Sequence, residues 1–446
     1  MEHSNTTSMT QGSILKQLLF FSIPLLLGNL FQQFYSTVDS VIIGNFVGDG
    51  ALAAVNSSDS VIYLFIHFFI GLSVGAGVVI ANRYGAKDYK NLSKSIHTAM
   101  ALTLVASIAL TIIGYLSIPF TLDIMNVDPD VLHDSTIYLQ TYFLGSFGII
   151  TYNMGSGILR AVGDSRRPLY ILIIACIINI VLDLIFVAVF KWGVFGVALA
   201  TSIAQVTSAI LVLLILINTN DIYQLKVSKI KFHKDSLSEI IRIGMPSAIQ
   251  NMIISLSNAI VQSNINTFGK HAMAGVGSYG KIDGFAILPV ISFSNALTTF
   301  VSQNIGAKEY DRVKKSVRVG ITLSCSVVLF ITSILFLFTH QILTLFSSNS
   351  VVIDYGTTMM KYMAPGYIIL AISHNLSGIL QGAGQTKTSM MILAFSWCIC
   401  RIVWIMITVA IFHDIRFVFM GWPVSWFISM IIMLLYFRKG TWLYKR

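Results

Sequence analysis

The chain has 446 residues, of which 55% are hydrophobic and only 11% are charged, and its mean hydropathy is +0.78. Soluble domains carry about 25% charged residues, so this composition excludes a water-soluble protein. The net charge of +10 does not indicate a nucleic-acid partner, because the basic residues lie in short segments between apolar runs. The four cysteines lie inside apolar runs and form no metal-binding pattern.

Twelve segments along the chain are apolar enough and long enough to cross a bilayer, which takes about 20 residues. Pro24, Pro246 and Pro289 fall inside three of them, where each removes a backbone donor and favours a kink. The chain is therefore predicted to be an all-α polytopic membrane protein. The twelve predicted transmembrane helices are 15–43, 51–81, 96–118, 135–157, 169–190, 194–217, 240–266, 273–302, 317–338, 357–380, 389–412 and 417–437.

The loops between these segments predict the orientation of the chain. Cytoplasmic loops of membrane proteins are enriched in Lys and Arg. If both ends of the chain are inside, the inner segments include the basic clusters at 83–94, 160–167, 226–242 and 308–318, and the outer loops are rich in Asp. We therefore expect both termini to be cytoplasmic.

Three pairs of similar segments show that the chain repeats itself. The members of each pair are separated by the same 221 residues (300 − 79, 378 − 157 and 269 − 48). The pairs are VIANRYGAKDYKNLSKS at 79–95 with FVSQNIGAKEYDRVKKS at 300–316, GILRAVGDSRRP at 157–168 with GILQGAGQTKTS at 378–389, and GDGALAAVNS at 48–57 with GKHAMAGVGS at 269–278.

The repeat divides the twelve helices into two pseudo-symmetric six-helix bundles. We expect an N-terminal bundle at 1–217, a cytoplasmic linker at 218–239 and a C-terminal bundle at 240–446. An even number of helices in each half gives both halves the same orientation. Parallel repeats of this kind are typical of transporters, with the substrate path between the halves.

Taken together, the two six-helix halves and the paired GAKDY/GAKEY and GILRAVGD/GILQGAGQ loops resemble the multidrug and toxic compound extrusion (MATE) family over essentially the whole chain. The resemblance implies two helix bundles that alternate between outward-open and inward-open states. It also implies export of organic cations and other amphiphilic compounds, driven by entry of sodium ions or protons. With the compact loops, it favours a bacterial plasma membrane and a monomer.

Charged and polar residues inside the apolar spans indicate where an ion binds. Asp39 and Asp183 lie within predicted spans, where a carboxylate is costly and marks a functional site by default. Asn179 and Asp183 are four residues apart and share a helix face. Asp183 lies nine residues before Trp192 and Thr201 nine after it, so a tight turn there places both at the same depth.

These four residues suit either a proton or a sodium ion. Two nearby carboxylates in a dry pocket raise each other's affinity for a proton, and hard oxygen ligands also suit a small cation. Asn179 and Thr201 alone are equally consistent with hydrogen bonds that only hold helices together. The MATE resemblance places Asp39, Asn179, Asp183 and Thr201 on a cation site, with Tyr138 close to it.

The second half of the chain lacks this acidic set. A shift of 221 residues takes Asn179 to Cys400 and Asp183 to Trp404, so the ion chemistry is expected to be asymmetric. This departs from branches of the family that have acidic residues in the C-terminal spans. Arg401 needs a partner at its depth, and Asp283 is the only carboxylate available in the spans of this half. We therefore expect an Arg401–Asp283 pair in the C-terminal cleft.

The predicted function is cation-coupled export by alternating access, with H⁺ or Na⁺ as the coupling ion and no other cofactor. The alternative is a lipid-linked oligosaccharide flippase of related architecture, which the helix count and the few charged residues disfavour. An enzyme is not expected, because the chain has no HExxH, P-loop or GxSxG motif. The expected partners are small amphiphilic or cationic molecules and the lipid bilayer.

Overall fold

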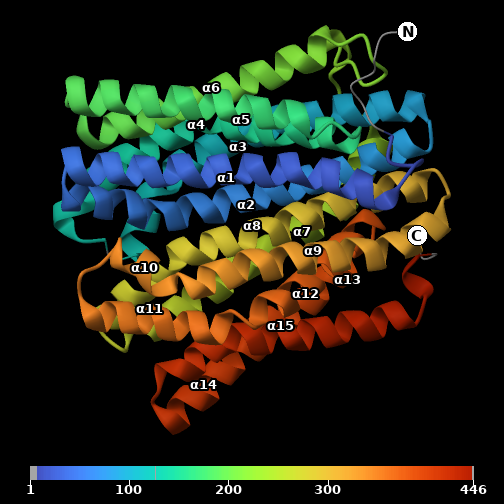
Figure 1. Cartoon of the computed structure of the whole chain (residues 1–446). Helices are drawn as coiled ribbons and strands as arrows, with labels where there is room; N and C mark the ends of the chain where they lie inside the picture. The colour runs from blue at the N-terminus through green and yellow to red at the C-terminus, as the bar shows by residue number, and fades with distance from the viewer. Residues whose placement is uncertain (1–7, 126, 444–446) are drawn as a thin grey trace. The chain divides into compact units, whose positions relative to one another are not determined.

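All regular structure in the described part of the chain is helical (Figure 1). The computed structural model describes residues 8–125 and 127–443, apart from the side chains at positions 49, 52, 53, 56, 57, 59–61, 63, 64 and 441. The helices of the first half are α1 (Ile14–Phe46), α2 (Asp49–Gly85), α3 (Tyr89–Ile124), α4 (Pro129–Ala161), α5 (Arg166–Asp183), the π-helical segment η1 (Leu184–Val189) and α6 (Gly193–Asn218).

The second half repeats this order of long helices after a connecting segment that holds the short 3₁₀ turn η2 (Val227–Lys229). Two of its spans are each built from more than one piece. The helices are α7 (Lys234–Asn266), α8 (Lys270–Gly306), α9 (Tyr310–Leu337), α10 (Thr339–Thr344), α11 (Ser350–Met363), α12 (Gly366–Gly382), α13 (Thr386–Leu393), the π-helical segment η3 (Ala394–Cys400), α14 (Arg401–Phe412), α15 (Ile415–Arg438) and the 3₁₀ turn η4 (Thr441–Leu443).

Each predicted span falls on helix, with one break. Among the described residues, nine helices are long and apolar enough to cross a membrane, and α11 with α12 makes a tenth if this pair, bent by 54°, is one span. The break between them lies at Ala364 and Pro365, because proline lacks a backbone donor and disfavours helix in the residue before it. The helices α4 and α7 are not among the ten.

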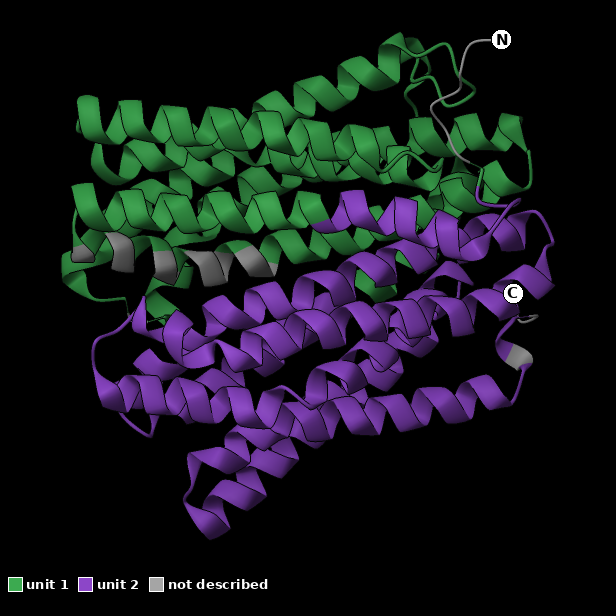
Figure 2. Ribbon diagram, in the orientation of Figure 1, with its two compact units in different colours: residues 1–8, 27–248 green, residues 9–26, 249–446 purple. Residues whose placement is uncertain are grey.

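The helices form two compact units (Figure 2). Unit 1 contains residues 1–8 and 27–248, and unit 2 contains residues 9–26 and 249–446. These boundaries differ from the expected halves, because they lie inside α1 and α7 rather than in the connecting segment. The first part of α1 belongs to unit 2, and the first part of α7 belongs to unit 1. Each change of unit follows a proline by two residues, Pro24 and Pro246.

Residues 9–26 are held in unit 2 by apolar packing and by a set of hydrogen bonds. Leu18, Phe21 and Leu25 are buried in one cluster with Phe300 of α8. The amide of Met9 donates to Gln303 Oε1 (3.0 Å), and Asn304 Nδ2 donates to the Met9 carbonyl (3.1 Å). Arg312 Nη2 donates to Gln17 Oε1 (2.9 Å). The start of α1 therefore packs as part of the C-terminal unit.

The corresponding part of α7 packs in unit 1 against α2. Gly75 lies directly against Gly244, so that an added Cβ would stand 2.3 Å from the Gly244 Cα. A Cβ added at Gly71 would likewise stand 2.4 Å from the Ala248 Cα. Small residues allow such close approach, and this is how helices associate in a bilayer, where apolar burial between helices gives no hydrophobic gain.

The arginine at the end of α2 fixes the start of α7. Arg83 Nη1 donates to Ser236 Oγ (2.8 Å), and its Nη2 forms an ion pair with Glu239 Oε2 (2.8 Å). Arg83 Nη1 also donates to the Asn91 carbonyl (3.0 Å) at the start of α3. One side chain thus connects three helices of unit 1.

Replacing Arg83 with glutamine is expected to lower the stability of unit 1 by about 1–3 kcal/mol, the range for lost charge-assisted hydrogen bonds. The measurement is the thermal denaturation midpoint of the purified protein in detergent. Lys90→Gln is the matched control, because Lys90 is exposed on the next helix. Equal midpoints for the two variants would contradict this role of Arg83.

Candidate ion site and buried arginine

The four residues predicted to bind an ion lie on three helices of unit 1. Asp39 is on α1 in the part that belongs to this unit, and Thr201 is on α6. Asn179 is one turn before Asp183, which is the last residue of α5 and directly precedes η1. A π-helical turn inside an α-helical span often marks a functional site, because it redirects side chains and frees backbone groups.

These residues form a buried polar cluster. Asn179 is 1% exposed, Asp183 0% and Thr201 7%. Asn179 Nδ2 donates to Thr201 Oγ1 (3.4 Å), so the turn between α5 and α6 does bring the two helices into the expected register. Asp39 is partly buried, and its carboxyl group lies close enough to that of Asp183 for the two to interact.

The cluster contains buried oxygen atoms for which the described residues provide no donor. They are one carboxylate oxygen of Asp39, both of Asp183 and the amide oxygen of Asn179. Buried polar atoms are normally hydrogen-bonded, and two facing carboxylates cannot satisfy each other unless one holds a proton. The cluster is thus short of a positive charge, which a proton or a small cation would supply.

Tyr138 is buried in an apolar cluster that also contains residues three or four positions from Asp39, Asp183 and Thr201 along their helices. It is 6% exposed and lies with Ile42 of α1, Val187 of η1 and Val197 of α6. The placement of Tyr138 beside the ion itself stays a prediction.

Gln205 was not predicted and lies one turn beyond Thr201 on α6. Its Nε2 donates to the Tyr142 hydroxyl (3.3 Å), whereas its buried Oε1 has no partner among the described residues. The spacing of four residues from Thr201 was the available signal. Gln205 adds another unsatisfied acceptor to the polar residues on α6.

The expected Arg401–Asp283 pair does not form in the structure. Arg401 is 1% exposed and donates from Nε to Ser425 Oγ (3.0 Å) and from Nη1 to Asn258 Oδ1 (3.0 Å). Its guanidinium carbon lies 5.8 Å and 5.7 Å from the ring centres of Trp397 and Trp422. Neutral acceptors and aromatic faces therefore surround this cation, and none of the described carboxylates reaches it.

Asp283 has a different set of partners in unit 2. The Tyr367 hydroxyl donates to Asp283 Oδ1 and is itself paired with the Tyr279 hydroxyl. Both tyrosines are fully buried. Tyrosine hydroxyls on α8 and α12 thus take the place of the expected arginine, and sequence spacing could not show which of these helices face each other.

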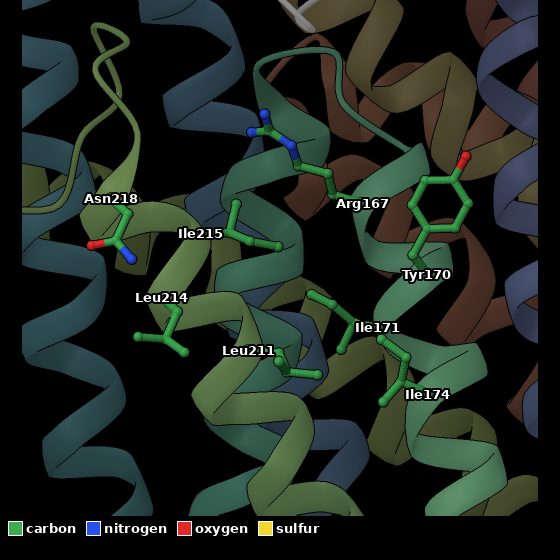
Figure 3. Close-up of a pocket in the computed structure, with 8 residues that line it drawn as sticks. All are labelled: Arg167, Tyr170, Ile171, Ile174, Leu211, Leu214, Ile215 and Asn218. Atoms are coloured by element: carbon green, nitrogen blue, oxygen red, sulfur yellow. The ribbon is translucent and has the colours of Figure 1, made fainter.

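An apolar groove of about 350 Å³ runs between α5 and α6 (Figure 3). At its polar end, Arg167 Nη1 donates to the hydroxyl of the buried Tyr223 (3.0 Å). Burial raises the pKa of Tyr223, so this hydroxyl stays neutral. The groove contains none of the predicted ion-site residues, and its exposed apolar side chains suit contact with lipid. Its lining is Arg167, Tyr170, Ile171, Ile174, Leu211, Leu214, Ile215 and Asn218.

The membrane-spanning helices, arranged in two units, and the acidic cluster inside one of them are the features of a multi-pass membrane transporter. The MatE family model matches residues 24–185 and again residues 246–407. The chain therefore belongs to the MatE family, the MATE-type multidrug efflux transporters. The resemblance seen in the sequence is confirmed, and so is the all-α fold class.

Relatives of similar length support this assignment. The chain is 28% identical to the probable multidrug resistance protein YoeA of Bacillus subtilis, covering 97% of this chain and 95% of that protein. It is 25% identical to the probable multidrug resistance protein NorM of Thermotoga maritima, covering 96% and 93%. A solved multidrug resistance MATE family transporter of the MOP superfamily has a TM-score of 0.92 at 24% identity, covering 99% of this chain and all of that one.

Proposed function

We propose that the protein is an antiporter of a bacterial plasma membrane that exports amphiphilic organic cations in exchange for H⁺ or Na⁺. The observation that carries this proposal is the set of buried acceptor oxygens on Asp39, Asn179 and Asp183 without a donor. Because this cluster needs a positive charge, its loaded and empty forms differ strongly in electrostatic energy. A bound ion shifts conformations only if it binds one of them more tightly.

The position of Asp39 on α1 indicates how ion binding is linked to substrate export. Asp39 is on α1, the helix that passes from unit 2 to unit 1 after Pro24. Loading of the Asp39–Asp183 cluster with a cation changes how the unit 1 part of α1 packs. This couples the ion to the position of a helix that both units share.

Export under defined gradients tests this function. Purified protein in liposomes is given a fluorescent organic cation, first with a sodium gradient alone and then with a pH gradient alone. We expect one of the two gradients to drive transport of the dye against its own gradient, and the effective gradient identifies the coupling ion. Transport that neither gradient drives would overturn the proposal, and dye movement independent of both would indicate a passive channel.

We also propose that both termini are cytoplasmic, and the basic residues of the segment that connects the two halves support this orientation. The connecting segment at 219–233 includes Lys226, Lys229 and Lys231. A cysteine placed at exposed position 229, in a variant whose four native cysteines are replaced by alanine, is expected to react with an impermeant maleimide only after cells are opened. Reaction in intact cells would reverse the orientation.

A further inference from the structure

Among the described residues, no carboxylate pairs with the buried guanidinium of Arg401, although it lies inside a membrane bundle. An ionisable residue at such a position normally has a partner or faces a water-filled space. Of the acceptors on described residues, only Asn258 and Ser425 reach it, and both are neutral. No acceptor in the described part of the chain reaches Nη2. A carboxylate from outside the chain would supply the missing charge.

One of the two residues that accept from Arg401 lies on a polar face of α7. Asn258 is exposed on α7, and Asn251, Ser255, Gln262 and Asn266 lie on the same face at spacings of three or four residues. A polar stripe of this kind faces water or a polar ligand rather than lipid chains. The amide oxygen of Asn258 is therefore the one acceptor that a ligand reaching Arg401 from this stripe would replace.

The surroundings of the guanidinium suit the aromatic part of a ligand as well. Trp397 and Trp422 lie against it, and Trp422 is only partly buried. Arg401 follows η3 directly, and the Ser257 hydroxyl donates to the Trp397 carbonyl of this segment (2.6 Å), which fixes η3 against α7. The fifth span of each repeat thus carries a buried charged residue next to a π-helical segment. This residue is Asp183 in unit 1 and Arg401 in unit 2.

We propose that Arg401, with Asn258 and Trp422, forms a recognition site for the carboxylate of an amphiphilic organic anion or zwitterion. The planar guanidinium binds a carboxylate through two parallel hydrogen bonds, and the indole of Trp422 packs against the apolar part of the same molecule. This inference rests on the proposed export function and extends its substrates from cations to molecules that carry a carboxylate.

The test is equilibrium binding of two matched xanthene dyes to the full-length protein in neutral detergent, measured by fluorescence polarisation. Fluorescein carries a carboxylate and is anionic, whereas rhodamine 123 is an ester and is cationic. Arg401→Gln is expected to weaken fluorescein binding at least about tenfold, as the loss of a charge-assisted pair implies, and to leave the Kd of rhodamine 123 within about twofold. Equal losses for the two dyes, or none for fluorescein, would overturn the site.

Asn258→Asp keeps the test decisive if Arg401→Gln fails to fold. The new carboxylate stands where Asn258 Oδ1 accepts from Nη1 at 3.0 Å, so it pairs with Arg401 inside the protein. We expect a thermal midpoint at least as high as that of the wild type and a tenfold or greater loss of fluorescein binding. Fluorescein binding at wild-type strength in this variant would refute the proposal.

The anionic headgroup of a lipid such as phosphatidylglycerol is the other group that would pair with Arg401 in a membrane. Loss of fluorescein binding upon adding equimolar phosphatidylglycerol, but not phosphatidylcholine, would overturn the assignment to an organic solute. Binding in detergent needs no ion gradient. Failure of this site and failure of ion-coupled export are therefore separate outcomes.

Discussion

Replacing Asp183 with asparagine is expected to reduce ion-driven export at least about tenfold, since coupling free energies between sites are typically 1–3 kcal/mol. The reason is the charge of the cluster. Asp183 supplies two of its buried acceptor oxygens, and asparagine is a neutral side chain whose amide can donate to Asp39. The variant therefore resembles the loaded state permanently and gains little from binding an ion. The measurement is initial export of a fluorescent organic cation from liposomes under the effective gradient.

The stability of the same variant separates lost coupling from misfolding. Because asparagine removes the repulsion between two facing carboxylates, the thermal midpoint in detergent is expected to be equal to or higher than that of the wild type. Asp123→Asn is the matched control, as Asp123 is exposed at the end of α3 and should keep full export. Full ion coupling in Asp183→Asn would refute the proposed site.

Adding one methyl group at Gly75 is expected to destabilise unit 1 by about 1–3 kcal/mol or more, the cost of overpacking a close contact. The new Cβ would stand 2.3 Å from the Gly244 Cα and 2.9 Å from the Ile240 carbonyl oxygen. These are backbone atoms, so no side chain can rotate away and α7 itself must shift. The measurement is the thermal midpoint of Gly75→Ala and the yield of monodisperse protein from membranes.

A second glycine on the same helix provides the control. At Gly77 the added Cβ would meet only the Gly157 carbonyl oxygen, at 3.8 Å, which is an ordinary contact. Alanine also favours helix over glycine by about 1 kcal/mol. We therefore expect Gly77→Ala to be neutral or slightly stabilising, opposite in sign to Gly75→Ala. A midpoint for Gly75→Ala that matches Gly77→Ala would show that α7 does not pack tightly on α2.

Hydropathy and repetition predicted most of the fold. A bilayer requires every backbone polar group in it to be bonded within the segment, so an apolar run of sufficient length specifies a helix almost regardless of its neighbours. The break at Pro365 shows the limit of this rule. Hydropathy does not say whether a helix bends or ends at a proline within an apolar run, and the structure shows a bend between α11 and α12. Pro24 and Pro246 predicted kinks near the two changes of unit, but not that residues 9–26 and 234–248 are exchanged between units. That exchange depends on which surfaces of α2 and α8 those residues fit.

The sequence predicted more of the ion cluster than of the surroundings of Arg401. Asn179, Asp183 and Thr201 were predictable because a helix period and one tight turn set their spacing, and both are local properties of the chain. The partners of Arg401 and Asp283 come from α7, α12 and α15, more than 20 residues away in each case. Charge alone suggested that they pair, but helix packing gave each of them neutral partners. The sequence by itself therefore determined the helices, the repeat and the acidic cluster, whereas only the tertiary structure decided which helices share a unit and what surrounds each buried charge.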